Sequence, residues 1–332
     1  MHKVLVTGGG GFIGKGIVRA LLSRGCQVTV VGRNPYPDLT QLGVRCLQGD
    51  IQDQSFLLQA FSGMDTVFHV AAKAGIWGSK ASYFGINVNG TKNVIGACLH
   101  NNISVLVYTS TPSVVFDRAP INGGNEQLAY AKRPLCHYAA SKIAAEKMVL
   151  QANDETLRTT AIRPHLVWGP GDRQLVPRLV ERGRQAQLKI VGDGVNKVDI
   201  SYIDNVVHAH ILAAENLHNE ATAAGEAFFI GQQEPVELWD WINVLFAQLG
   251  VPKVEQRVAF PVAYLAGAVL EAGYTILGKN EEPGMTRFLA HQLAHSHWFA
   301  HTKAEQILRY KEQVNTTQGV ANLVAWIKEQ HL

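Results

Sequence analysis

The chain has 332 residues, of which 47% are hydrophobic and 17% charged, and its net charge is +3 with histidine neutral. This length is sufficient to bury a large core, and we expect a main domain with a smaller second lobe. No block of basic residues stands out, which argues against nucleic acid as a partner. The four cysteines include no C-x-x-C pair and follow no signal peptide, so we expect reduced thiols in a cytoplasmic protein.

The chain opens with a pattern typical of a dinucleotide-binding turn. A short apolar strand is expected at 3–7, followed by Gly8, Gly11 and Gly14, and the apolar spacing from Ile17 onward predicts a helix. Glycine permits positive φ and close approach of the backbone to a pyrophosphate, which would rest on the free N–H groups of the helix start. The spacing is G-x-x-G-x-x-G rather than G-x-G-x-x-G. The strand before it and the helix after it favour a dinucleotide site over a flexible turn.

Strands and helices alternate through the first half of the chain. Apolar runs at 28–31, 44–47, 66–70, 105–108 and 160–163 are separated by helical stretches. This rhythm predicts an α/β fold with a doubly wound parallel sheet of the Rossmann type.

The same rhythm predicts how the chain divides. We expect a dinucleotide-binding domain over 1–165, with part of 196–232 returning to it, because Gly225 and Gly231 bracket a short apolar run at 228–230. The rest of 166–332 should form a smaller, mostly helical lobe that shapes the substrate pocket.

Tyr138 and Lys142 stand four residues apart, a spacing that places both on one face of a helix. The lysine ammonium can then reach the ribose of a bound nicotinamide nucleotide, and its field would lower the pKa of the phenol. A phenol that titrates nearer neutrality can donate a proton to a carbonyl oxygen, so we interpret Tyr138 as a general acid. Alone, Y-x-x-x-K usually marks an exposed helix face, but the glycine turn upstream favours the catalytic interpretation.

The end of the second strand bears on the choice of cofactor. A site specific for NAD usually has an acid there that binds the adenosine ribose hydroxyls and repels a 2′-phosphate. Here Val31 is followed by Gly32, Arg33 and Asn34. An arginine after an uncharged position suits a 2′-phosphate, so we expect NADP(H) to be preferred, with NAD(H) also able to bind. In the alternative interpretation, Arg33 only stacks on the adenine and both cofactors bind.

These motifs together resemble the extended short-chain dehydrogenase/reductases. In family order they are the glycine turn, 49–51 (GDI), 69–72 (HVAA), 87–91 (NVNGT), 108–111 (YTST), the Tyr138/Lys142 pair, 163–164 (RP) and 169–172 (GPGD). The resemblance implies a nicotinamide-dependent oxidoreductase in which Asp50 accepts a hydrogen bond from the adenine amino group. Together with Arg33, the cofactor-binding residues it implies are Gly8, Gly11, Phe12, Ile13, Gly14, Asp50, Ile51, Ala71, Ala72, Lys142 and Pro164.

The family places a catalytic serine or threonine third in a short hydroxyl-rich run at the end of the fifth strand, and here that position is Thr111. Its hydroxyl can donate to a substrate carbonyl as a serine does. Ser110 and Ser113 are alternatives, because Pro112 can shift the local backbone. Asn87 is expected on the helix behind the site, where it holds a water or the backbone, or is an ordinary polar residue at a helix start.

The C-terminal half is similar to the 3β-hydroxysteroid dehydrogenase group. The similarity rests on 282–287 (EPGMTR), 297–299 (HWF), 303–304 (KA) and 326–327 (WI). Within that group, 36–39 (YPDL) and 109–116 (TSTPSVVF) look most like bacterial reductases of 2-alkyl-3-oxoalkanoates in olefin biosynthesis. The resemblance implies NADPH-dependent reduction at C3 of a β-keto acid with two long alkyl chains, with Tyr138, Lys142 and Thr111 as the catalytic residues.

Other functions stay open at this point. A steroid or sterol-like alcohol dehydrogenase would use the same machinery. A nucleotide-sugar epimerase or dehydratase is less favoured, because Phe116 and Asp117 follow the active-site strand where sugar-nucleotide enzymes commonly carry Tyr-Gly. A non-catalytic NADP-binding protein is the third alternative, and the intact Tyr138/Lys142 pair argues against it.

Loop residues and one apolar segment bear on the substrate. Trp77, His165 and Trp168 lie in loops that should edge the nicotinamide end of the site, although tryptophans also serve simple packing. The apolar segment 258–277 contains Pro261 and Glu271, which argues against a membrane-spanning helix. It forms either core or an exposed surface that guides a lipid-like substrate or docks on a membrane or a pathway enzyme.

The densest group of histidines lies at 291, 295, 297 and 301. No acidic residue lies between or just beside 291 and 295, so we expect a polar helix end and no metal site. The expected partners are a small lipid-like substrate and a second copy of the chain in a homodimer. The expected location is the cytoplasm, with peripheral membrane contact as a further option.

Overall fold

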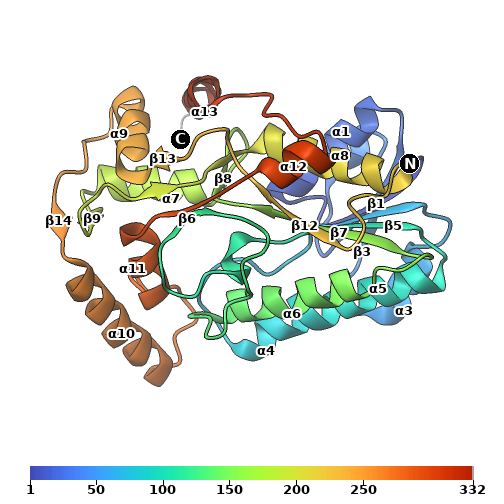
Figure 1. Ribbon diagram of the computed structural model, residues 1–332, viewed down its shortest axis with the longest axis horizontal. Coiled ribbons are helices and arrows are strands. Elements are labelled where there is room, and N and C mark those ends of the chain that lie inside the picture. The colour runs from blue at the N-terminus through green and yellow to red at the C-terminus, as the bar shows by residue number, and fades with distance from the viewer. Residues whose placement is uncertain (331–332) are drawn as a thin grey trace.

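The computed structural model describes residues 1–330. Its centre is a sheet of seven parallel strands in the order β12-β7-β5-β4-β1-β2-β3, with helices on both faces (Figure 1). The strands are β1 (Lys3–Thr7), β2 (Gln27–Gly32), β3 (Arg45–Gln48), β4 (Thr66–His69), β5 (Val105–Thr109), β7 (Arg158–Pro164) and β12 (Glu226–Ile230). The strand order reverses between β1 and β4, which is where such sheets bind ligands. The predicted doubly wound sheet is confirmed.

Two layers of helices bury the two faces of the sheet. One layer holds α1 (Phe12–Ser23) and α8 (Ile203–His218), and the other holds α3 (Gln54–Ala60), α5 (Gly90–His100) and α6 (His137–Gln151). Shorter elements between the strands are α2 (Pro37–Gln41), α4 (Lys80–Tyr83), a π-helical turn (Phe84–Asn89), and a 3-10 turn (Pro112–Val114). Because strand side chains alternate, Val4 and Val6 enter the core beneath α1 while Leu5 enters the core on the opposite face.

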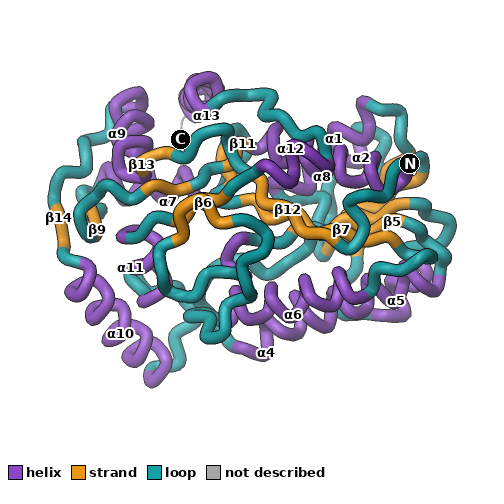
Figure 2. Tube along the Cα trace, in the orientation of Figure 1, coloured by secondary structure: helices purple, strands orange, loops and turns teal. Residues whose placement is uncertain are grey.

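Most residues after β7 lie outside the central sheet and are mostly helical (Figure 2); we refer to them as the lobe. Its helices are α7 (Leu175–Arg184), α9 (Leu238–Leu249), α10 (Phe260–Ile276), α11 (Arg287–Ala294), α12 (Thr302–Ile307) and α13 (Thr316–Glu329). Short strands accompany them: β6 (Ile121–Gly124), β8 (Val167–Trp168), β9 (Ile190–Val191), β10 (Lys197–Val198), β11 (Ser201–Tyr202), β13 (Val236–Glu237), β14 (Arg257–Val258) and β15 (His297–Phe299). β12 returns to the main sheet and pairs in parallel with β7.

The apolar segment near residue 260 forms α10 at the edge of the lobe (Figure 1). It packs on α11 through a narrow side, where a Cβ on Gly267 would come within 2.6 Å of the Thr286 backbone. The other side is open, with exposed fractions of 59% for Val262, 65% for Leu265 and 64% for Val269. Of the two interpretations of this segment, the structure shows the exposed surface rather than core. Across residues 1–330, no helix has the length and apolar character needed to cross a bilayer.

Candidate active site

A cavity of about 1420 Å³ lies along the carboxyl ends of the central strands. The glycine turn lines one part of it, and the Tyr138 region lines another. The sequence-predicted residues that line it are Gly8, Gly11, Phe12, Ile13, Gly14, Arg33, Asp50, Ile51, Ala71, Ala72, Thr111, Tyr138, Lys142, Pro164 and His165. Residues more than 150 positions apart in the chain are therefore brought to one site.

The glycine turn has no room for side chains. Gly8 has a φ of 68°, and a Cβ there would come within 2.8 Å of the Ala71 backbone. A Cβ on Gly14 would come within 2.2 Å of the Gly8 carbonyl oxygen. α1 then starts at Phe12 without a side-chain cap, so the first N–H groups of the helix lack intrahelical partners. A pyrophosphate fits this bare, N–H-rich turn.

The adenosine end of the cavity contains residues that the sequence analysis missed. The ring of Tyr36 lies against the glycine turn, because a Cβ on Gly10 would meet its Cε1 at 1.9 Å. Lys15 also lines the cavity and forms an ion pair of 2.6 Å with Asp38. The side chain of Asp50 accepts a hydrogen bond from the Gln52 backbone N–H at 2.9 Å. The glycines at positions 10 and 32, which both face Tyr36, are the feature of the sequence that could have revealed the position of this ring.

Lys142 is buried on α6, one turn after Tyr138, and lines the cavity. Its ammonium donates a hydrogen bond of 2.6 Å to the carbonyl oxygen of Thr109 and lies 4.2 Å from the centre of the Tyr108 ring. Burial lowers the pKa of Lys142 to about 7, and the negative charge of Glu146 opposes this shift. The lysine charge therefore depends closely on its surroundings.

Tyr138 does not show the lowered pKa that we expected from Lys142. Burial raises the pKa of Tyr138 to about 12, and a side-chain hydrogen bond with Thr111 only partly offsets the shift. The expectation is wrong for this structure because burial of the phenol dominates its pKa, and burial also disfavours the charge of Lys142. The phenol is consequently protonated at neutral pH.

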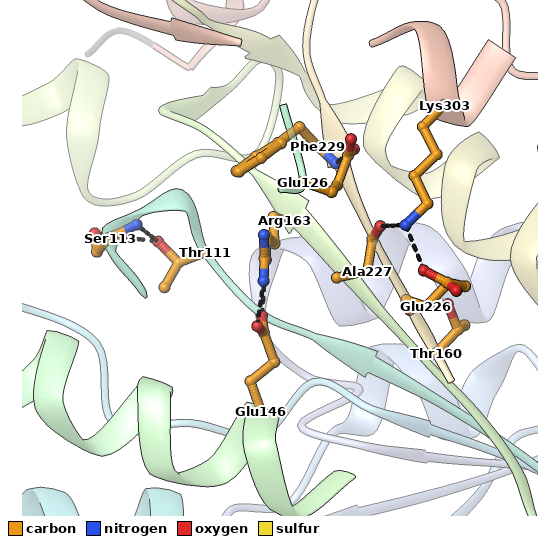
Figure 3. A network of polar contacts seen from close by, with 10 residues as sticks. All are labelled: Thr111, Ser113, Glu126, Glu146, Thr160, Arg163, Glu226, Ala227, Phe229 and Lys303. Carbon is orange, nitrogen blue, oxygen red and sulfur yellow. Dashed lines mark hydrogen bonds and ion pairs between the residues drawn. The ribbon is translucent and has the colours of Figure 1, made fainter. Parts of the chain in front are cut away.

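Thr111 lies where the 3-10 turn begins after β5, and it caps that turn (Figure 3). Its Oγ1 accepts a hydrogen bond of 3.2 Å from the Ser113 backbone N–H and lies 3.2 Å from Ser113 Oγ. Among the described residues, the buried Ser110 hydroxyl has no hydrogen-bond partner. Since the side-chain bond to Tyr138 comes from Thr111, the geometry favours Thr111 over its neighbours as the group beside the phenol.

Polar side chains fix the backbone around these residues. Asn87 accepts from the Lys73 N–H at 2.7 Å, donates to the Lys73 carbonyl at 3.1 Å, and donates to Ser141 Oγ at 2.9 Å. Of the roles we considered for Asn87, the structure shows that it holds backbone. Deeper in the protein, Arg163 of β7 pairs with Glu146 of α6, as Figure 3 shows. That buried pair ties the helix carrying Lys142 to the sheet.

Two of the three predicted substrate residues do not line the cavity. Trp168 is fully buried in the core, edge-on to Tyr202 and Trp241 at 5.2 and 5.3 Å. Trp77 donates to the Lys279 carbonyl at 3.1 Å, so it joins its loop to the end of α10. For both tryptophans, the expected role as a cavity wall is wrong. The ring of Trp168 packs in the core, and the ring of Trp77 is held by its hydrogen bond to Lys279. His165 does line the cavity.

The histidines at 291 and 295 pack in an aromatic cluster. Their rings lie 5.1 Å apart and contact Phe260 edge-on at 4.9 and 4.6 Å. Within residues 1–330, no group of three or more potential metal ligands is gathered in one place. Instead of the polar helix end that we expected, His291 is buried among aromatic rings.

A Rossmann-type sheet, a side-chain-free glycine turn, and a Tyr/Lys pair at one cavity define an NAD(P)-dependent oxidoreductase of the extended short-chain dehydrogenase/reductase class. The comparisons agree with this class. The chain belongs to the 3-beta hydroxysteroid dehydrogenase/isomerase family, whose model matches residues 5–262. The family-level prediction is thus confirmed.

Similar proteins include two bacterial enzymes named 2-alkyl-3-oxoalkanoate reductase. The one from Stenotrophomonas maltophilia is 47% identical over 97% of this chain and 98% of its own length. The one from Shewanella oneidensis is 47% identical over 98% of this chain and 86% of its own length. The decarboxylating sterol-4-alpha-carboxylate 3-dehydrogenase of Mus musculus is 34% identical over 97% of this chain and 90% of its own.

Solved structures share the fold along the whole chain. MoeE5 in complex with UDP-glucose and NAD has a TM-score of 0.76 and 25% identity, covering 99% of this chain and 100% of that one. The crystal structure of gox2253 has a TM-score of 0.82 and 24% identity, covering 99% of both chains. The second likeness shows the fold alone.

Proposed function

We propose that this enzyme uses NADPH to reduce the 3-oxo group of a long-chain 2-alkyl-3-oxoalkanoate to the 3-hydroxy acid, in olefinic hydrocarbon biosynthesis. The observation that carries the proposal is the 47% identity, over nearly the whole chain, to two reductases of that substrate class. The 34% identity to a sterol-4-alpha-carboxylate 3-dehydrogenase supports a second candidate, a sterol-like 3-dehydrogenase that uses the same residues.

The proposed chemistry assigns one task to each catalytic side chain. When bound, NADPH supplies a hydride to the carbonyl carbon. Tyr138, which its raised pKa keeps protonated, donates a proton to the carbonyl oxygen, while Thr111 donates a hydrogen bond that orients that oxygen. Proton transfer leaves Tyr138 as a phenolate. Lys142, one helical turn away, stabilises that phenolate when the lysine is protonated.

Arg33 supports the preference for NADP(H). Its side chain is exposed at the cavity, and within residues 1–330 it has no hydrogen-bond or ion-pair partner. Lys15, in contrast, is already neutralised by Asp38. A free guanidinium after β2 can form charge-assisted hydrogen bonds with a 2′-phosphate. Because the same group can also stack on an adenine, NAD(H) remains the second cofactor of the proposal.

The proposed substrate matches the walls at the other end of the cavity. Ile76 and Ile86 line the cavity from the region after β4, and Phe288 and Leu289 line it from α11. Phe288 packs edge-on against Phe116 at 6.0 Å, which fixes this wall near the end of β5. Apolar walls of this kind favour alkyl chains. We therefore propose that the lobe within 166–332 binds substrate while 1–165 binds the cofactor.

The exposed side of α10 supports a peripheral contact with a lipid surface. The only charged residue of the helix, Glu271, is paired with Arg287 at 2.7 Å, so the open side is apolar. We propose that this side rests on lipid, next to the lobe that takes a lipid-like substrate. Val269→Asp should then reduce co-sedimentation with phospholipid vesicles, whereas Val195→Asp, at a valine 60% exposed outside α10, should not. If Val269→Asp instead disrupts the proposed homodimer, α10 is an interface between copies.

One assay separates the candidate functions. NADPH oxidation is followed with purified protein against a long-chain 2-alkyl-3-oxo acid, a 3-oxosteroid and a nucleotide sugar. The proposal expects the highest kcat/KM for the oxo acid. Preferential turnover of the steroid would favour the sterol-like function, and lack of turnover with all three would favour a non-catalytic protein.

A further inference from the structure

A pair of histidines connects the cavity to the lobe. His165 directly follows β7, and its Nε2 lies 2.7 Å from Nδ1 of His297 on β15. The other nitrogen of His297, Nε2, lies 2.9 Å from the carbonyl oxygen of Gln292. A carbonyl only accepts, so His297 carries its proton on Nε2 and must accept at Nδ1. His165 therefore donates from Nε2, and its Nδ1 is left as an acceptor.

That acceptor belongs to a residue of the cavity wall. His165 lines the cavity, and its Nδ1 has no hydrogen-bond partner within residues 1–330. An unpaired acceptor held in fixed orientation is suited to binding a ligand group.

Strand register places His165 near the catalytic threonine. β5 and β7 are neighbours, with Thr109 opposite Ile162. Thr111 lies two residues beyond that pair on one strand, and His165 lies three residues beyond it on the other. Both side chains line the same cavity as Tyr138. A ligand group that contacts His165 would therefore be close to the carbonyl that Tyr138 protonates.

The proposed substrate carries one polar group besides its 3-oxo group, and that group is a carboxyl. The names of the bacterial and mouse relatives share this feature, since in each a carboxylate is attached to the carbon next to C3. At the reacting end of the cavity, one donor of the Lys142 ammonium is bound to the Thr109 carbonyl, and the proposed mechanism leaves the others to the cofactor ribose and Tyr138. Arg19, Arg24, Arg33 and Lys15 lie near the glycine turn and β2, and Arg173 lines the cavity from the loop after β8. Of the described cavity residues that directly follow β5 and β7, His165 has an unpaired ring nitrogen and can serve as a partner for a carboxyl near Thr111.

Resting on the proposed function, we propose that Nδ1 of His165 binds the carboxyl group of the substrate, and that His297 is a positioning residue which fixes the ring. One proton is shared between the carboxyl oxygen and Nδ1. The substrate enters as a carboxylate, and that proton comes from the solvent, so charge and protons balance. Recognition of this kind distinguishes a β-oxo acid from a plain ketone.

The pair starts neutral, and the negative charge of the substrate carboxylate would favour the proton that binds with it. Burial lowers the pKa of both His165 and His297, so both rings are neutral before substrate binds. Asp199 opposes the shift at His297, and His295 adds to it. Asp199 itself is held by the Phe299 N–H at 2.9 Å and lies 3.2 Å from His301 Nε2, away from the cavity.

The test compares an acid with a matched molecule that lacks only the carboxyl. The oxidative direction avoids unstable oxo acids: a 2-alkyl-3-hydroxy acid and the secondary alcohol with the same two chains are assayed with NADP⁺. The readout is the ratio of kcat/KM for the acid to kcat/KM for the alcohol. Wild type should favour the acid. His165→Phe should lower the ratio roughly ten- to hundred-fold, mainly through KM, the effect of losing one hydrogen bond to a charged group.

Three further variants check the role of each ring. His297→Phe should lower the ratio as His165→Phe does, whereas His297→Gln, which can still accept and donate, should restore most of it. His295→Gln is the matched control, because that ring does not line the cavity. Fluorescence titration with NADPH verifies that each variant is folded. If His165→Phe does not bind NADPH, the acid-to-alcohol ratio of His297→Phe is used to test the proposal instead.

The outcomes separate this inference from the proposed function. An unchanged ratio in the folded variants, or a wild type that oxidises acid and alcohol equally well, overturns the role of His165 and leaves the reductase intact. A wild type that oxidises neither compound overturns both.

Discussion

Lys142 donates a hydrogen bond of 2.6 Å to the carbonyl oxygen of Thr109, two residues before Thr111. The contact joins the helix that carries the Tyr/Lys pair to the strand that leads to Thr111. An ammonium has three donors, so Lys142 can keep this bond and still donate to a ribose hydroxyl. In the proposed mechanism, Lys142 therefore links the cofactor, the acid Tyr138 and the end of β5.

If Tyr138 supplies the proton, Tyr138→Phe should lower kcat by several orders of magnitude and leave NADPH binding nearly intact. The reason is that the phenyl ring keeps the packing but has no proton to donate. Steady-state kinetics and fluorescence titration measure the two quantities. Tyr274→Phe is the control, a phenol on α10 that does not line the cavity. Near-normal turnover in Tyr138→Phe would show that another group is the acid.

Burial of Lys142 should make the stability of the cofactor-free protein depend on pH. Its pKa is about 7 in the folded protein and 10.5 in the unfolded chain, so between these values the unfolded chain binds more protons. The free energy of unfolding should therefore rise with pH across this window, by at most ~1.4 kcal/mol per pH unit. Urea unfolding of wild type and Lys142→Met at about pH 7.5 and pH 9.5 measures it. Parallel profiles for the two proteins would contradict the lowered pKa.

Arg33→Ala should weaken NADPH binding by roughly 1–3 kcal/mol and scarcely change NADH binding, since only the 2′-phosphate would lose its charge-assisted hydrogen bonds. Arg45→Ala is a charge-matched control, because Arg45 is exposed on the neighbouring β3 and does not line the cavity. Titration of both variants with both cofactors gives the comparison. A wild type that prefers NADH would sink this assignment.

Trp168→Ala should lower the free energy of unfolding by about 3–5 kcal/mol, the range for emptying a large buried aromatic site. Trp77→Ala should cost less, because that ring is only half-buried. Denaturant unfolding of the two variants tests the corrected role of Trp168. If Trp168→Ala changed KM for the substrate and left the free energy of unfolding unchanged, Trp168 would instead be a substrate-binding residue.

The sheet and the glycine turn could be predicted because their causes are local. Short apolar runs separated by helical periodicity allow few folds, and Gly8 and Gly14 stand where the backbone has no room for a Cβ. The Tyr138/Lys142 spacing likewise needs only one helix.

Other properties depend on distant parts of the chain. Trp168 is expected in a loop from its sequence, but it lies in the short strand β8, and its ring is covered by Tyr202 and Trp241, which follow it by more than 30 residues. The raised pKa of Tyr138 comes from enclosure, which no spacing reveals. His165 and His297 are 132 positions apart, so their contact could not be read from either motif.

The central claim is that the cavity takes a long-chain 2-alkyl-3-oxo acid, and a chain-length series tests it most directly. We predict that kcat/KM with NADPH rises with each added methylene, by up to about 0.8 kcal/mol of binding free energy, until the cavity is full. The stable 3-hydroxy acids can be assayed in the oxidative direction for the same trend. A flat series, or faster turnover of nucleotide sugars than of any oxo acid, would contradict the claim.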